Sequence, residues 1–261
     1  MAREEKSTGL GWGFWVRAVL WTGILIVSLT VMYKIRQFTL RDARFTLHGP
    51  DRRADGLIME GLVYTSRAKV LHNFDADFER SIFESPLAER RRRLLGIDWV
   101  QDASVSRVWP NRLIIRVTER KPVAFVNLPR PRGRDGRVLL IDEEGVLLEQ
   151  PVQSKFKFPV LRGIREEHTD AERRRRVIAM LHVMDELGPF AKDISEVEAS
   201  GTGDITIVAQ VQGRAVELML GDRNFTNRVQ NFLTHYPEVR RHSAAAPVFD
   251  LRLDDRITAR E

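Results

Sequence analysis

The side chains that could do acid–base, nucleophilic or metal chemistry are scattered through this sequence. The six histidines lack the His-x-x-x-His and His-Glu-x-x-His spacings that place metal ligands on one helix face. The absence of cysteine excludes a disulfide scaffold, a thiolate zinc site and a cysteine nucleophile. The carboxylate pairs Glu143-Glu144 and Asp254-Asp255 are typical of solvated turns rather than of an acid–base pair. We therefore expect no catalytic residue, no metal and no cofactor.

Two runs of four arginines, residues 90–93 and 173–176, are the strongest local concentrations of charge. Four consecutive positions point around a helix axis and form no flat basic stripe, and no aromatic side chains interleave as base-stacking platforms. With a net charge of only +6, the sequence predicts no nucleic-acid binding. The arginines are expected on solvated helix faces, in local pairs such as Glu89 with Arg93. The alternative to solvated faces is that these arginines contact an anionic membrane surface.

An uncharged apolar stretch lies near the N-terminus. Residues 18–33 contain no charged side chain, and together with residues 11–17 they reach the ~20 residues that a membrane-spanning helix needs. The alternative is a cleaved signal peptide, but the stretch exceeds the usual apolar core of ~7–15 residues and no Ala-x-Ala-like site follows. We predict an uncleaved transmembrane helix over residues 12–33, after a short tail of residues 1–11.

The charges that flank this stretch do not determine its orientation. The tail before it carries Arg3 and Lys6. The far flank carries four basic residues, which are Lys34, Arg36, Arg41 and Arg44. Because positive charge favours the cytoplasmic side, the count taken alone favours an external N-terminus.

Residues 44–119 have the pattern of a small α+β module. The expected elements are a strand over residues 44–48, a helix over 65–74, a helix that starts after Ser85, and strands over 105–108 and 113–117. Ser85 would cap the second helix, and Pro86 would suit its first position. The last two strands form a hairpin, because the turn signal Trp109-Pro110-Asn111-Arg112 separates them.

Residues 120–261 are expected to be mostly antiparallel sheet with two helices. The expected strands cover residues 123–127, 138–141, 146–148, 194–199, 205–211, 215–220, 248–253 and 257–259. Thr169 and Glu172 form a capping box in front of a helix that ends at Gly188-Pro189. A second helix, over residues 224–236, is expected to stop at Pro237.

Three consecutive motifs carry a family resemblance. They are Trp-Val-x-x-Ala-x-Val-x-Arg-x-Trp-Pro at residues 99–110, Leu-x-Ile-x-Val-x-Glu-Arg-x-Pro-Val-Ala at 113–124 and Leu-Ile-Asp-x-x-Gly at 140–145. This stretch resembles the bacterial cell-division family FtsQ, called DivIB in Gram-positive bacteria. Weaker similarity continues at residues 220–221, 232–233 and 250–252. The chain departs from the family pattern at Asp98, where members often have proline, and in the arginines at 90–93.

The resemblance implies an α+β fold with a single N-terminal transmembrane helix. Its expected parts are a cytoplasmic tail (1–11), the helix (12–33), a linker (34–43), a β-α-α-β-β POTRA domain (44–119) and a mostly antiparallel β-domain with two helices (120–261). Members keep the N-terminus in the cytoplasm and the main domains in the periplasm, at the division septum. They have no catalytic activity, bind no small-molecule substrate, and scaffold the division complex between its early and late proteins.

The resemblance also implies a mode of partner binding, in which FtsB and FtsL add a strand to the C-terminal edge of the β-domain. The matching residues here are Asp250, Leu251, Arg252, Leu253, Asp254, Asp255, Arg256, Ile257 and Thr258. A terminal strand has unpaired backbone groups that can template another chain. Its charges would discourage indiscriminate pairing and admit a charge-complementary partner. For Arg252, pairing with a nearby carboxylate or carbonyl is an equal alternative.

A different class of protein also carries POTRA modules, namely components of outer-membrane protein assembly or secretion. Those proteins usually combine tandem modules with a long amphipathic barrel and a cleaved signal. This sequence contains one such module, which favours the division scaffold.

Overall fold

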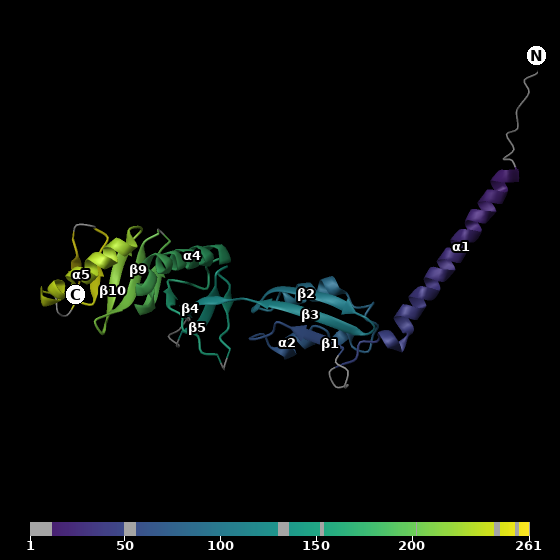
Figure 1. The fold of residues 1–261 in the computed structure, drawn as a ribbon, viewed down its shortest axis with the longest axis horizontal. Coiled ribbons are helices and arrows are strands. Elements are labelled where there is room, and N and C mark those ends of the chain that lie inside the picture. The colour runs from purple at the N-terminus through teal and green to yellow at the C-terminus, as the bar shows by residue number, and fades with distance from the viewer. Residues whose placement is uncertain are drawn as a thin grey trace, which may run out of the picture. The chain divides into compact units, whose positions relative to one another are not determined.

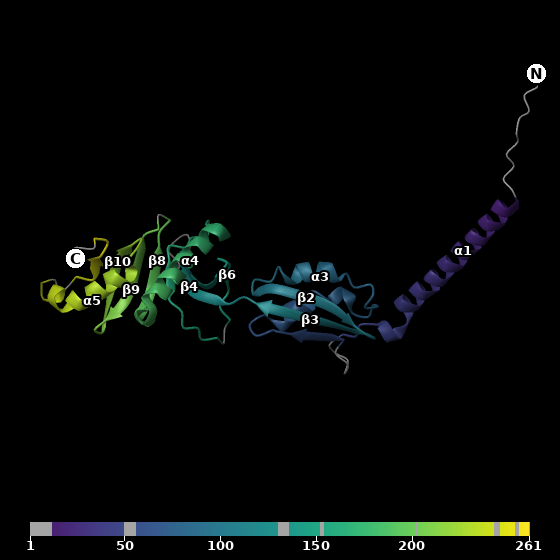
Figure 2. The same ribbon diagram turned by 45° about the horizontal axis from the view of Figure 1, so that its top comes forward.

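The computed structural model describes residues 12–49, 56–129, 136–151, 154–201, 203–242, 246–253 and 256–260. By its internal contacts the chain divides into two compact units, one ending at Thr118 and the other beginning at Glu119. Figures 1 and 2 show the elements of each unit along the chain. The mixture of helices and sheet confirms the predicted α+β class.

The first helix, α1, spans Trp12–Arg41. Its segment Phe14–Arg41 is long and apolar enough to cross a membrane, and none of its most apolar window is buried within the protein. The helix continues beyond residue 33, so most of the segment predicted as a linker is helical, because neither glycine nor proline interrupts it. Asp42 follows the helix, and its carboxylate accepts a hydrogen bond of 2.9 Å from the backbone N–H of Arg44.

The rest of the first unit has the expected β-α-α-β-β order. Its elements are β1 (Leu57–Glu60), α2 (Arg67–His72), α3 (Leu87–Leu94), β2 (Val100–Val108) and β3 (Arg112–Glu119). The strands form a sheet in the order β1-β3-β2, with β1 parallel to β3 and Leu57 opposite Leu113. A core of buried apolar residues lies between this sheet and the helices.

The first strand of this unit was wrongly predicted at residues 44–48. Residues 43–45 form a 3-10 turn, and Thr46 makes only an isolated bridge to Ser81. Phe45 and Leu47 are nevertheless buried. The alternation of apolar and polar residues therefore reflects burial of a loop and not pairing in a sheet, which begins at Leu57.

The prediction that residues 90–93 are solvated is wrong for Arg90. Its side chain is only 6% exposed and binds Asp77 through two hydrogen bonds, of 2.6 and 2.9 Å. Ser85 does not cap α3 as predicted; its hydroxyl instead donates to Asp77 at 3.1 Å. The expected ion pair of Glu89 with Arg93 is confirmed. A charge can enter this core because its counter-charge, 13 residues earlier in the chain, is buried with it.

The second unit contains a nine-stranded sheet. Its strands are β4 (Pro122–Leu128), β5 (Arg137–Asp142), β6 (Leu147–Leu148), β7 (Val160–Arg162), β8 (Ile194–Ala199), β9 (Ile205–Val211), β10 (Arg214–Gly221), β11 (Val248–Asp250) and β12 (Thr258–Arg260). Their order is β12-β11-β10-β9-β8-β7-β4-β5-β6. The pairing is antiparallel except for β4 with β7, β7 with β8, and β10 with β11. The sheet is therefore mostly antiparallel, as expected.

Two long helices, α4 (Asp170–Leu187) and α5 (Phe225–His242), share one apolar core with this sheet. The predicted capping box of Thr169 and Glu172 is confirmed at the start of α4. The prediction that the second helix stops at Pro237 is wrong, since α5 continues to His242. Tyr236 is buried and Val239 is partly buried against the core, so packing on both sides of the proline holds the helix together.

Candidate functional site

The last strand, β12, forms one edge of the nine-stranded sheet. It pairs antiparallel with β11, with Phe249 opposite Ala259, and β11 runs parallel to β10. Among the strands that the structure describes, β12 has a neighbour on one side only. Its other side therefore offers backbone N–H and C=O groups to an incoming strand.

Aromatic packing holds β11 on helix α5, and β11 in turn carries the edge strand β12. The ring of Phe249 lies 5.0 Å from that of Phe232 and 6.0 Å from that of Tyr236, measured between centroids. Phe249 and Phe232 are fully buried. After the strand, the backbone N–H of Leu251 donates to the carbonyl of Met219 at 2.9 Å, which continues the attachment to β10. The edge is thus built on a rigid base.

Charged side chains tie β12 to β11. The carboxylate of Asp250 accepts hydrogen bonds from Arg252 at 2.7 and 2.9 Å and from Arg260 at 2.9 Å. Hydrogen bonding to the Arg252 guanidinium is the main cause that lowers the pKa of Asp250 below its usual range. Asp250 therefore stays ionised near neutral pH. Of the two uses predicted for Arg252, the pairing with a nearby carboxylate is present, while 42% of its side chain remains exposed.

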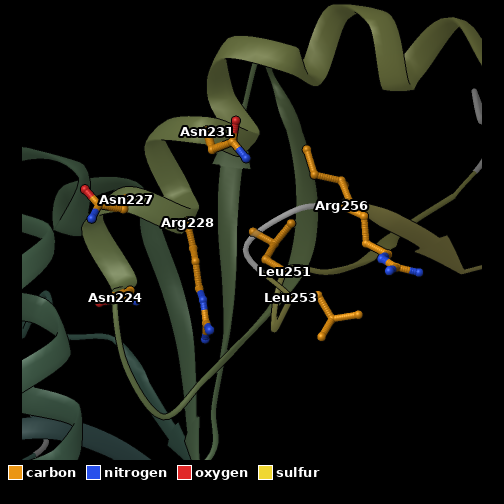
Figure 3. Close-up of a pocket in the computed structure, with 8 residues that line it drawn as sticks. Asn224, Asn227, Arg228, Asn231, Leu251, Leu253 and Arg256 are labelled. Atoms are coloured by element: carbon orange, nitrogen blue, oxygen red, sulfur yellow. The ribbon is translucent and has the colours of Figure 1, made fainter.

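A pocket of about 470 Å³ lies between α5 and the segment that joins β11 to β12. Its lining comes from the start of α5, from the residue before it and from that segment: Asn224, Asn227, Arg228, Asn231, Leu251, Leu253, Arg256 and Ile257. Figure 3 shows Asn227, Arg228 and Asn231 on the helix, Asn224 just before it, and Leu251, Leu253 and Arg256 across from them. Two of these described residues are arginines and none is acidic, while Asp254 and Asp255 of the same segment lie outside the described residues.

Gly221, at the end of β10, provides room for two of the arginines. Its φ is +78°, and a Cβ atom there would lie 2.8 Å from Nη1 of Arg228 and 3.3 Å from Cγ of Arg252. Arg228 is buried and donates to the carbonyl of Leu220. A side chain at position 221 would displace the side chains of these two arginines, so their positions require glycine here.

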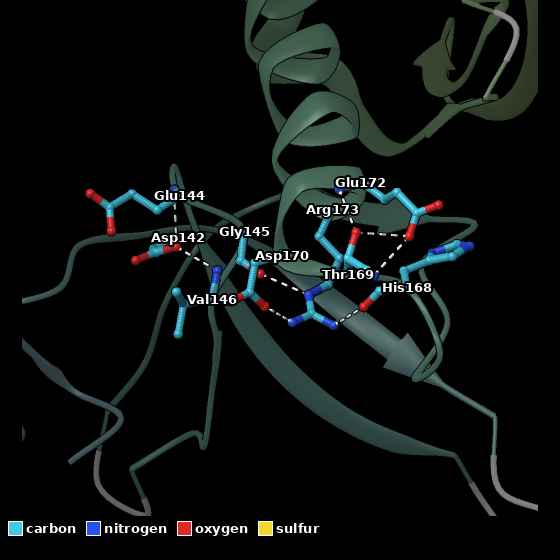
Figure 4. Close-up of polar contacts among 9 residues, drawn as sticks. All are labelled: Asp142, Glu144, Gly145, Val146, His168, Thr169, Asp170, Glu172 and Arg173. Carbon is cyan, nitrogen blue, oxygen red and sulfur yellow. Dashed lines mark hydrogen bonds and ion pairs between the residues drawn. The ribbon is translucent and has the colours of Figure 1, made fainter. Parts of the chain in front are cut away.

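The opposite edge of the sheet, at β6, is built differently. The turn before β6 is held by Asp142, whose carboxylate accepts from the backbone N–H groups of Glu144 and Val146 at 3.0 and 2.8 Å. Arg173 of α4 donates to the carbonyls of Gly145 and His168 and pairs with Asp170. Figure 4 shows these contacts at the start of α4. The first turn of α4 is therefore attached to the turn that precedes this edge strand.

The second arginine run thus contains another error of prediction. The Arg173 side chain is only 12% exposed and is used within the fold, although all four arginines were expected on a solvated face. Arg174 and Arg175 are exposed, as expected. In the part of the chain that the structure describes, no three histidine, aspartate or glutamate side chains are grouped so that they could hold a metal ion.

Comparison with known proteins gives the same division of the chain. Residues 55–120 match the family model "POTRA domain, FtsQ-type", and residues 132–252 match "Cell division protein FtsQ/DivIB, C-terminal". The "Cell division protein FtsQ" of Koribacter versatilis is 32% identical over 246 residues, which cover 92% of this chain and 68% of that protein. This chain belongs to the FtsQ/DivIB family of cell division proteins.

Two further relatives carry the name "Cell division protein FtsQ". The one from Novosphingobium aromaticivorans is 26% identical over 237 residues, covering 90% of this chain and 70% of that protein. The one from Actinobacillus pleuropneumoniae is 29% identical over 162 residues, covering 61% of this chain and 63% of that protein. The resemblance to FtsQ inferred from the motifs at residues 99–145 is thereby confirmed.

Within this FtsQ-family chain, the nine residues predicted for partner binding fall into different environments. Leu251 is buried, whereas Arg252, Leu253, Arg256 and Thr258 are exposed. Asp250 closes β11, Ile257 is half-buried beside the pocket, and Asp254 and Asp255 lie outside the described residues. The strand predicted over residues 248–253 ends at Asp250, because Arg252 turns back onto that carboxylate.

The residues of α5 that line the pocket were not singled out from the sequence. Asn227 and Asn231 have the spacing i and i+4, which places polar side chains on one face of a helix, with Arg228 beside them and Asn224 just before the helix. That spacing was a readable signal. What it could not indicate is that this face lies beside the C-terminal strands of an FtsQ-type β-domain.

Proposed function

We propose that this chain is a non-enzymatic scaffold of the bacterial division complex, which links early and late division proteins through contacts outside the cytoplasmic membrane. The single observation that carries the proposal is the open edge of β12 beside a pocket lined by arginines, in an FtsQ/DivIB-family chain. In this proposal α1 crosses the cytoplasmic (inner) membrane once, with the N-terminus in the cytoplasm and both domains in the periplasm at the septum.

The proposed division of labour follows the predicted domains. Residues 44–119 act as the POTRA domain and residues 120–261 as the β-domain that receives FtsB and FtsL. Strand addition gives affinity through backbone hydrogen bonds, while the adjacent pocket selects the partner by a side chain. Because Arg256 places a positive charge at the exposed rim of the pocket, the partner's anchoring side chain is expected to be acidic.

The test is co-purification with FtsB and FtsL, comparing the full chain with a chain truncated after Leu253. This truncation removes β12 but keeps the buried Leu251 and its hydrogen bond to Met219. We expect the truncated chain to lose both partners. A thermal melt of each form measures whether the β-domain is still folded.

A point variant tests the same proposal in the intact chain. Arg256→Glu reverses a charge at the exposed rim of the pocket, so partner binding is expected to fall while the fold is retained. Arg174→Glu, on an exposed face of α4, is the matched control and is expected to bind normally. Undiminished binding by both the truncated chain and Arg256→Glu would reject the edge of β12 as the binding site.

Depletion in cells tests the proposed role in division apart from the binding site. Cells without the protein are expected to form filaments that segregate their DNA but do not septate. Normal division after complete depletion, in a strain without a second copy of the gene, would contradict the role.

A further inference from the structure

The end of α1 is attached to the first globular unit by a group of aromatic rings. The ring of Phe38, in the last turns of the helix, lies 5.7 Å from that of Phe45. The ring of Phe45 lies 5.3 Å from that of Trp109, and the ring of Phe83 lies 5.7 Å from that of Trp109. The hydroxyl of Ser81 also donates to the helix carbonyl of Thr39 at 2.7 Å. The turn between β2 and β3 therefore lies beside the end of α1.

This turn exposes large apolar side chains. Trp109 is 66% exposed although it contacts two phenylalanines, and Val108 beside it is 36% exposed. Phe38 is half exposed on the adjacent helix. Tryptophan, whose ring is apolar and whose N–H is polar, is the residue most typical of the boundary between membrane and water.

The position along α1 places this turn near a membrane surface. The apolar run ends at Tyr33, and Phe38 follows five residues later, which is about 7.5 Å along a helix axis at ~1.5 Å per residue. The headgroup layer on each side of a bilayer is about 5–8 Å thick. With the apolar run inside the hydrocarbon, Phe38 and the rings packed near it lie at the depth of the headgroups.

Charge around the turn favours an anionic surface. The exposed basic residues at the end of α1 and beside the turn are Lys34, Arg36, Arg41, Arg44 and Arg112, whereas the guanidinium of Arg107 donates to the carbonyls of Ile82 and Ser85. Among the described acidic residues of this part of the chain, Asp42 is paired with Arg44 and Glu84 is exposed. The guanidinium of Arg44 also lies over the ring of Phe38, 5.2 Å from its centroid. Basic residues next to a membrane helix are attracted to anionic lipids.

We propose that the turn at residues 108–110 docks on the headgroup layer of the membrane that α1 enters, with Trp109 in the interface and the flanking basic residues on anionic lipid phosphates. The occupant of this apolar surface is the bilayer itself, because the surface continues directly from the apolar helix. The proposal rests on the membrane crossing proposed above. Docking would hold the first domain against the membrane instead of leaving it to swing about the end of α1.

The absence of cysteine makes a labelling experiment direct. Single variants Gly23→Cys, Asn111→Cys and Val63→Cys, each in the full chain, carry a fluorophore in lipid discs that contain nitroxide lipids. Gly23 is in the middle of the apolar run and a Cβ there meets nothing within 4 Å. Asn111 directly follows the proposed docking residues 108–110 and precedes β3. Val63 is a matched exposed control, because it follows the end of β1 that points away from this turn.

We expect nitroxides deep in the acyl chains to quench the label at position 23, and nitroxides on the headgroups to quench the label at position 111. The label at position 63 is expected to escape both. Trp109→Ser in the Asn111→Cys chain should abolish the quenching at 111 without lowering the thermal midpoint of the second unit. Replacing phosphatidylglycerol by phosphatidylcholine should weaken the quenching at position 111, because the basic residues lose their counter-charge.

The possible results separate the two proposals. If position 23 is quenched but position 111 behaves like position 63, docking is wrong while the membrane anchor stands. If position 23 is not quenched, the membrane crossing fails and docking fails with it. A blue-shifted label at 111 without nitroxide quenching would mean that protein, and not lipid, covers the turn. Equal quenching in both lipid mixtures would overturn the assignment to anionic headgroups.

Discussion

The two edges of the nine-stranded sheet are finished in opposite ways. At β6 the last strand has two residues, Leu148 is buried, and the first turn of α4 reaches the turn before the strand through Arg173. At β12 the described residues include no strand on the outer side, and the ion pairs of Asp250 with Arg252 and Arg260 lie beside the strand.

The difference shows how one sheet can disfavour strand pairing at one edge and leave the other edge available to a partner strand. A two-residue strand, whose preceding turn is fixed by a helix, offers little backbone to a partner. An edge strand flanked by charges resists random pairing but still accepts a complementary chain. We therefore expect changes at the β6 edge to alter stability and leave partner binding unchanged. Changes at the β12 edge should mainly weaken partner binding, with smaller effects on stability.

The largest loss of stability is expected from Gly145→Val, in the turn before β6. Position 145 has φ +84°, and a Cβ there would lie 2.6 Å from both the backbone N of Arg174 and the backbone O of Asp170. Neither backbone atom can move aside, so strain and overlap together should lower the free energy of unfolding by about 3 kcal/mol or more. Urea unfolding followed by circular dichroism measures it. Gly213→Ala, at φ +78° with open space around it, should cost only about 1 kcal/mol. Equal losses of stability in the two variants would mean that α4 does not pack tightly against the turn before β6.

Arg173→Ala should have the next largest effect. The substitution leaves the carbonyls of Gly145 and His168 without this donor and removes the partner of Asp170. We expect a loss of about 2 kcal/mol in the free energy of unfolding, and unchanged co-purification with FtsB and FtsL. Arg174→Ala, on the exposed side of the same turn, is the control and should change stability by less than about 0.5 kcal/mol. Loss of partner binding in Arg173→Ala would break the contrast between the edges.

Asp250→Asn should cost about 1 kcal/mol at neutral pH, since it weakens hydrogen bonds to two arginines at the open edge. The folded pKa of Asp250 lies below its unfolded value, so its contribution is present above the unfolded pKa, ~3.9, and is lost as the pH falls through the folded pKa. The free energy of unfolding, measured between pH 7 and the acid range, should therefore fall less steeply in Asp250→Asn than in the parent chain. Parallel curves would show that Asp250 does not contribute to the loss of stability in acid.

Leu253→Ala should have the smallest effect on stability and a clear effect on binding. The side chain is 56% exposed, so the free energy of unfolding should change by less than about 0.5 kcal/mol. It lines the pocket beside β12, and losing its burial by a partner should weaken binding about tenfold. Titration calorimetry with a partner peptide measures this change. Leu233→Ala, at an exposed position of α5 outside the pocket lining, is the matched control and should bind normally.

Features that depend on neighbours in the chain could be predicted. The capping box of Thr169 with Glu172 and the strands at residues 194–199 and 205–211 depend on local hydrogen bonds or on period-two alternation, and they occur as expected. The same reasoning failed at residues 44–48, where alternation marks a buried loop. It also missed β7, because three residues are too few to show a period.

The amino-acid sequence by itself determined the apolar helix, the order of elements in the first domain and most of those in the second, the family, and the segment in which a terminal strand would lie. These properties follow from composition, periodicity and motif spacing. Only the tertiary structure decided that Arg90 and Arg173 lie inside the fold, that α5 lines a pocket beside β12, and that Trp109 packs against the end of α1. In each case the deciding contact joins residues distant in the chain, and a charge or ring is buried or exposed according to what the fold brings to it.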